Sequence, residues 1–164
     1  MTTWWAGKTR QVMRHVTGRV APEERAQLAT WLTPAQLSLF DRMHPADRRH
    51  GLDVVAALQL DGHDAPELLL AGLFHDASKG PDTRLWHRVA WSLGDRYGDW
   101  IWSACRPVPG FARALDRIRT HPSDSALLAL AAGCPRSTAE LIRHQSAPRD
   151  PVAGEWLRLA DEAS

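Results

Sequence analysis

The pair His75-Asp76 is the part of this sequence best suited to chemistry, because it directly follows a wholly apolar segment. Residues 68–74 read Leu-Leu-Leu-Ala-Gly-Leu-Phe, which is apolar on every side of a helix and so predicts a buried helix. An ionised carboxylate at the end of a buried helix is costly unless it has a partner. Adjacent helical residues project about 100° apart, so both side chains reach one cation only where the helix ends, as Gly80 suggests. The pair therefore predicts a divalent metal ion whose other ligands come from other segments.

Further candidate ligands are polar residues that lie beside core-type residues, as inward-facing ligands of a helical domain do. They are His50, His121, His144 and Asp161. For any one histidine the alternative is a hydrogen-bonded core residue. Imidazole and carboxylate ligands without sulfur favour manganese or iron, with zinc and nickel as alternatives, over calcium. Neither Cys105 nor Cys134 has zinc-type spacing, and we expect both to be free thiols.

The elements that must position these residues are predicted to be helices throughout. Apolar residues recur at helical spacing between Pro, Gly and Asp, and no stretch alternates as a half-buried strand would. We expect an all-α fold: a single compact helical bundle at residues 33–164 with the metal site between helices, and a helical extension at 1–32 packed on it. The expected helices lie at 4–20, 22–32, from 34, 45–61, 66–74, 83–96, 98–104, 110–119, 122–132, 137–144 and 151–161.

Composition limits the classes of partner. The 164 residues suit one domain, and 20 basic against 19 acidic side chains give no reason to expect a nucleic-acid partner. The sequence has no apolar run of the roughly 18 residues that a membrane span requires and no signal-peptide pattern, so we expect a cytoplasmic protein. Residues 1–21 are basic and include Trp4 and Trp5, so peripheral membrane contact is possible for them. We favour the alternative, in which this segment packs on the core.

With these residues the chain resembles the HD-domain metal-dependent phosphohydrolases over residues 44–162. The segment 73–80 is similar to the family's apolar-HD-x-x-K-G motif, and the order His50, His75-Asp76, Asp161 follows its signature. His121 and His144 match the two extra histidines of the branches with two metal ions. The resemblance implies that His50, His75 and Asp161 hold one ion, that His121 and His144 hold a second, and that Asp76 bridges the two.

The resemblance also implies a function: hydrolysis of a small phosphate ester or diester, nucleotide or cyclic-nucleotide-like, by a metal-activated hydroxide. Asp76 and Lys79 would be the catalytic residues, with Lys79 contacting a non-bridging phosphate oxygen, and Arg49 would help to bind substrate. The alternatives are a solvated lysine at a helix end and an ordinary salt-bridged arginine. For the whole protein, the alternative is a non-catalytic HD-type regulatory or binding module.

Two departures separate the chain from the HD-GYP branch of cyclic-dinucleotide phosphodiesterases. Gln145 follows His144 where related sequences often have another histidine, and no Gly-Tyr-Pro segment follows. Ser78 also stands where the motif often has glycine. We therefore expect a member that is not of the typical HD-GYP type.

Overall fold

The computed structural model describes residues 19–80 and 85–164 and shows an all-α bundle there, as expected. The predicted helix at 4–20 falls almost wholly outside the described residues. The described part contains α2 (Pro22–Leu28), α3 (Pro34–Arg42), α4 (Pro45–Leu60), α5 (Pro66–Phe74), α6 (Leu85–Tyr97), α7 (Trp100–Cys105), α8 (Phe111–Ala131), α9 (Arg136–Arg143) and α10 (Ala153–Ala163). Four of these helices begin with proline, which suits the first helical position because no hydrogen bond is needed from its nitrogen.

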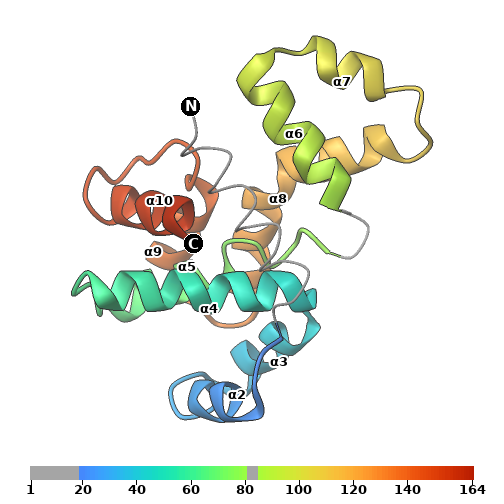
Figure 1. Cartoon of the computed structure of the whole chain (residues 1–164). Coiled ribbons are helices and arrows are strands. Elements are labelled where there is room, and N and C mark those ends of the chain that lie inside the picture. The colour runs from blue at the N-terminus through green and yellow to red at the C-terminus, as the bar shows by residue number, and fades with distance from the viewer. Residues whose placement is uncertain (1–18, 81–84) are drawn as a thin grey trace.

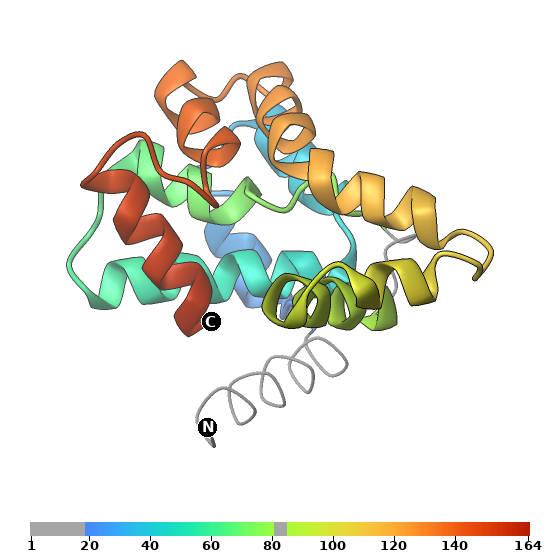
Figure 2. The ribbon, with the colours of Figure 1, turned by 90° about the horizontal axis from the view of Figure 1, so that it is seen from above.

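Helix α5 is the centre of the main hydrophobic core. Every residue from Leu68 to Phe74 is buried, and the helix packs against α4, α8, α9 and α10. Figure 1 shows α4 crossing the molecule with α10 next to it, and Figure 2 shows the same pair from above. The predicted buried helix before His75-Asp76 is therefore confirmed, and its C-terminal end lies inside the bundle.

A close approach of α4 and α5 depends on glycine. A Cβ on Gly51 would lie 2.5 Å from the backbone oxygen of Leu73, a distance that no side chain tolerates. The absent side chain lets the two backbones meet one residue after His50 and two residues before His75. The contact therefore holds the two histidine-bearing segments together.

Helix α8 differs from the prediction of two helices at 110–119 and 122–132. It is one helix of 21 residues, and Pro122 lies inside it. Proline is common at the start of a helix, which is why the sequence predicts a helix beginning there. Inside a helix, its missing N–H is tolerated when the carbonyl left without that donor finds another one. His121 consequently lies in the middle of a helix and not before one.

Helix α6 packs on α8, and α7 packs on α6 (Figure 1). Their own core consists of Ala90, Phe111 and Leu115, with Trp91, Trp102 and Cys105 packed against it. Cys105 and Cys134 are both free thiols, as expected.

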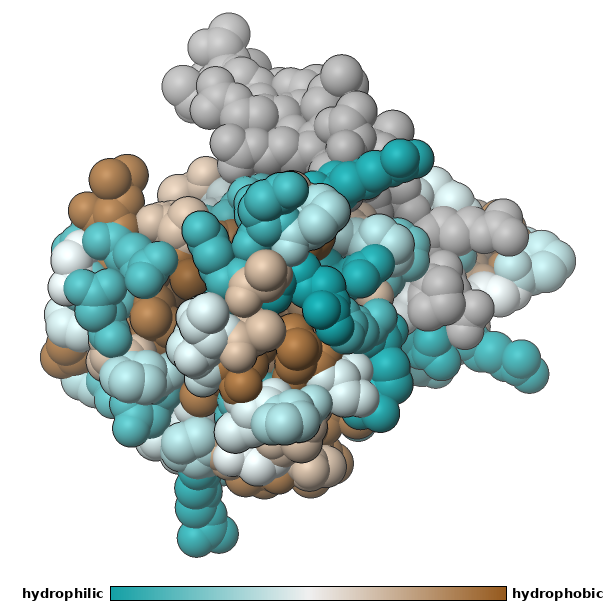
Figure 3. Space-filling model, turned by 90° about the horizontal axis from the view of Figure 1, so that it is seen from below, coloured by the Kyte–Doolittle hydropathy of each residue, from teal (hydrophilic) through white to brown (hydrophobic). Residues whose placement is uncertain are grey.

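Within the described residues, no helix combines the length and the apolar character that crossing a bilayer requires. On the face shown in Figure 3, apolar side chains form patches separated by hydrophilic ones.

Candidate metal centre

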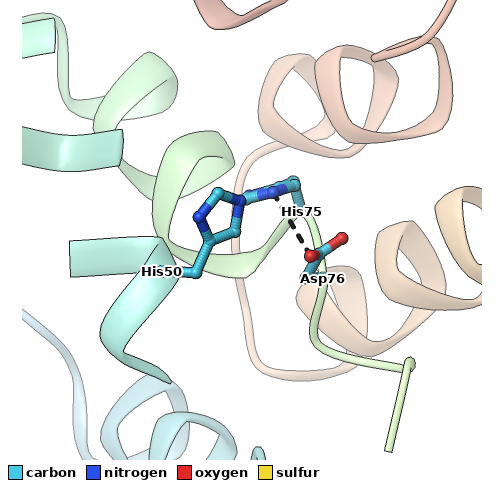
Figure 4. A group of neighbouring side chains, drawn as sticks. All are labelled: His50, His75 and Asp76. Atoms are coloured by element: carbon cyan, nitrogen blue, oxygen red, sulfur yellow. Dashed lines mark ion pairs between the residues drawn. The ribbon is translucent and has the colours of Figure 1, made fainter. Parts of the chain in front are cut away.

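The candidate centre begins with His50 on α4 and His75 at the end of α5. The two imidazole rings lie edge to face with centroids 5.1 Å apart. Ligand atoms of His50, His75 and Asp76 all lie within 4.8 Å of one another, and Figure 4 shows the three side chains converging from the two helices. His75 and Asp76 are both 1% exposed.

The end of α5 fixes the orientation of His75. A helix leaves its last carbonyls without helical partners, and Nδ1 of His75 donates a hydrogen bond to the carbonyl of Gly72 at 2.8 Å. This bond leaves Nε2 as the nitrogen that faces the centre. A hydrogen bond to one ring nitrogen is how proteins orient the other toward a metal.

Asp161 on α10 completes this group from the other end of the sequence. Its Oδ1 lies 2.7 Å from Nε2 of His50 and 3.4 Å from Nε2 of His75. Three separate elements, α4, the end of α5 and α10, thus bring these side chains together, and Asp161 joins the group of His50, His75 and Asp76 through its contacts to the two histidines. The structure brings together these four of the six predicted ligands.

The carboxylate of Asp76 faces two groups with its two oxygens. Oδ2 lies 3.6 Å from Nε2 of His75 and also contacts the ammonium of Lys79. Oδ1 lies 3.4 Å from Nε2 of His121. Asp76 therefore stands between the histidine group described above and His121 on α8.

Pro122 has a direct part in the orientation of His121. The carbonyl of Ile118 would normally accept from the N–H of residue 122, which proline lacks. Nδ1 of His121 donates to that carbonyl instead, so its Nε2 faces Asp76. The amide Nε2 of Gln145 lies 3.0 Å from this same Nε2 and donates to it. Gln145 is therefore a buried residue of the site. From the sequence it stands out only as a departure from the HD-GYP pattern.

Two predicted site residues lie elsewhere. His144 ends α9, and its Nε2 is 3.6 Å from Oε2 of Glu140, outside the group of converging ligand atoms. Arg49 is ion-paired with Glu24 at 2.6 Å and with Asp53 at 3.0 Å. Its guanidinium is thus held between two carboxylates on the α2 side of α4, which matches the alternative of a salt-bridged arginine.

The electrostatics of the centre favour positive charge. Burial lowers the pKa of His75, but Asp76 and Asp161 outweigh it and raise this pKa to about 9. Burial raises the pKa of Asp76, yet His75 and Lys79 hold it well below its usual range. His75 and His50 lower the pKa of Asp161 in the same way against the effect of burial. Two carboxylates are therefore ionised and are balanced by the imidazolium of His75 and the ammonium of Lys79, and a metal ion would take the place of the His75 proton.

The donor set fits a transition-metal ion. Nε2 of His75 and Oδ1 of Asp76 are buried and have no hydrogen-bond partner among the described residues. Buried polar atoms are normally hydrogen-bonded, so two unpartnered ones on adjacent residues, one on the side of Asp161 and one on the side of His121, indicate a ligand. Nitrogen and carboxylate oxygen without sulfur suit manganese, iron, zinc or nickel.

Comparison with known proteins assigns no family. No protein-family model, no curated protein and no solved structure matches this chain. The resemblance to HD-domain phosphohydrolases thus stays a prediction, and any proposal of function depends on the centre itself.

Proposed function

We propose that the protein is a metal-dependent phosphohydrolase of the HD type that cleaves a small phosphate ester or diester. The observation that carries the proposal is the convergence of ligand atoms of His50, His75 and Asp76, with Asp161 in contact with both histidines and with Nε2 of His75 and Oδ1 of Asp76 left unpartnered. When bound, a divalent ion supplies Lewis acidity, an activated water and positive charge for phosphoryl oxygens. Since both cysteines are free thiols, a reducing cytoplasmic location belongs to the proposal.

The chain's own residues would prepare this chemistry in defined ways. The Gly72 and Ile118 carbonyls fix the rings of His75 and His121. Lys79 holds its ammonium at Oδ2 of Asp76, where it is close enough to the centre to meet a phosphate oxygen. Its role would be to position Asp76 in the resting site and to bind the anionic substrate.

The number of ions is a separate part of the proposal. His50, His75, Asp76 and Asp161 would hold the first ion, and a second would use the other oxygen of Asp76 together with His121. For that second ion the Gln145 amide would have to leave Nε2 of His121, and His144 would have to turn away from Glu140.

Metal content and turnover together test the proposal. The purified protein is loaded with Mn²⁺, desalted and analysed by elemental mass spectrometry, and its hydrolysis of p-nitrophenyl phosphate and bis(p-nitrophenyl) phosphate is measured. The expected result is one or two ions per chain and turnover, both lost in the double variant His75→Ala/Asp76→Ala. Asp64→Asn, at an exposed position outside the centre, is the control and should match the wild type.

Three other outcomes would contradict or restrict the proposal. Metal binding without turnover, across several metals, would favour the non-catalytic regulatory or binding module. No metal retained above the level of the double variant would overturn the proposal. One ion that is insensitive to His121→Ala would restrict the centre to the first group of ligands.

A further inference from the structure

A pocket of about 560 Å³ lies beside the candidate centre without including any of its proposed ligands. Its walls come from α3, from the turn after α5 and from one face of α8. The lining residues are Leu39, Arg42, Met43, Ala77, Ser78, Arg113, Asp116, Arg117, Thr120, Asp124 and Leu128. Pockets of this size hold small organic ligands.

The pocket borders the centre on two sides. Ala77 and Ser78 directly follow Asp76, and Thr120 directly precedes His121. The shared wall is tied together, because the N–H of Ser78 donates to Oγ of Ser125 at 3.1 Å and its hydroxyl donates to the carbonyl of His121 at 3.0 Å. A ligand in this pocket would therefore lie against the segments that carry Asp76 and His121.

The charged groups of the pocket favour an anion. Arg42 and Arg113 are exposed, and neither forms an ion pair within the part of the chain that the structure describes. Arg117 extends to the turn that closes the His-Asp segment, where a Cβ on Gly80 would lie 3.3 Å from its Nη1. Against the three arginines, the pocket has two carboxylates, those of Asp116 and Asp124. That of Asp124 accepts a hydrogen bond from Thr120 at 2.8 Å. Guanidinium groups bind phosphate through paired, charge-assisted hydrogen bonds.

Part of the remaining wall is apolar, beside Ser78 and Thr120. Leu39, Met43, Ala77 and Leu128 lie on the same pocket as the arginines. An inorganic anion would use only the arginines, whereas an organic phosphate would also cover this apolar surface and gain from its burial.

We propose that this pocket is a binding site for an organic phosphate, with Arg42 and Arg113 holding the anionic group and the apolar wall holding the organic part. The choice of phosphate rests on the proposed function. The evidence for an anion site comes from the lining residues of the pocket, which include none of the proposed metal ligands. It would select ligands that carry an apolar or planar group together with a phosphate.

The test uses metal-free protein, so that binding in the pocket is separated from binding to an ion. Full-length protein in EDTA is titrated with 1-naphthyl phosphate, 1-naphthol and inorganic phosphate by isothermal titration calorimetry. We expect 1-naphthyl phosphate to bind about tenfold or more tightly than either fragment. The double variant Arg42→Ala/Arg113→Ala should bind it about tenfold or more weakly, since charge-assisted hydrogen bonds are lost.

Two further variants define what the arginines do. Arg149→Ala removes an exposed arginine outside the pocket and should leave affinity unchanged. Arg113→Lys keeps the charge without the paired donors, so affinity should fall partway. Thermal unfolding checks that each variant is folded.

The failure of this proposal differs from the failure of the proposed function. Equal affinity of the wild type and the Arg42→Ala/Arg113→Ala variant, or no gain of 1-naphthyl phosphate over inorganic phosphate, overturns the pocket and leaves metal content unaffected. A protein that retains no Mn²⁺ but binds 1-naphthyl phosphate through these arginines overturns the phosphohydrolase and leaves the pocket standing.

Discussion

Asp76 uses its two carboxylate oxygens for different neighbours, and this division makes it the central residue of the site. One oxygen meets His75 and Lys79, and the other meets His121. A buried carboxylate is stable only when such partners surround it. The sequence showed that Asp76 needed partners, but which oxygen meets which partner depends on the turn that ends α5.

At the residue scale, Lys79→Met should separate metal binding from turnover. The variant removes the ammonium beside Asp76 but none of the proposed ligand atoms. We expect Mn²⁺ content close to that of the wild type and kcat lower by about 10²-fold, as when one charge-stabilising donor is lost. Elemental analysis and p-nitrophenyl phosphate kinetics measure the two quantities. Unchanged kcat would restrict Lys79 to a structural counterion of Asp76.

His75 should give the metal-free protein a pH-dependent stability. Its pKa is raised from the ordinary value of 6.5 to about 9 in the fold. The stabilisation is therefore fully present below pH 6.5 and is lost as the pH rises through 9. The pKa of Asp161 is lowered from 3.8, so its contribution is present above that pH and is lost as the pH falls.

The measurement is the thermal unfolding midpoint in EDTA across this pH range. We expect the midpoint to fall between pH 6.5 and 9, and this fall should be much smaller in His75→Asn. A midpoint that declines equally in both proteins would contradict the assignment to His75.

At the element scale, Pro122 shows why α8 was predicted as two helices. Proline is frequent at a helix start, so the sequence predicts that a helix begins at Pro122. The prediction was wrong because His121 supplies the donor that proline lacks, which a local pattern does not reveal. In contrast, the buried character of α5 was predictable, since its residues are apolar on every side.

Pro122→Ala tests whether the proline orients His121 on α8. The variant restores an N–H for the Ile118 carbonyl and removes a proline whose cost inside a helix reaches about 3 kcal/mol. We expect the variant to unfold at higher temperature, while Nδ1 of His121 must share the Ile118 carbonyl with the restored N–H. In metal-free protein, ¹⁵N-detected histidine spectra should show the Nδ1–H tautomer of His121 in the wild type and a tautomer mixture in the variant. An unchanged tautomer would show that Pro122 is only a packing residue.

At the scale of the whole molecule, the site joins segments that are far apart in the sequence. His50 and Asp161 are separated by 111 residues, yet α4, α5 and α10 bring them to one point. The sequence predicted which residues these were, because each is polar beside core-type residues. It could not place His144, whose Nε2 lies 3.6 Å from Glu140 and has no hydrogen-bond partner among the described residues.

Because α10 carries Asp161, an ion at the centre would tie it to α4 and α5. A ligand that binds only the folded state at 100 times its Kd adds about 2.7 kcal/mol of stability. Mn²⁺ should therefore raise the thermal midpoint of the wild type and slow amide hydrogen exchange in α10 more than in α6 and α7, which have a separate core. Asp161→Asn should lose most of both effects, and Asp64→Asn should keep them. Equal protection of α6 and α10 would mean that the ion stabilises the protein without binding between α4, α5 and α10.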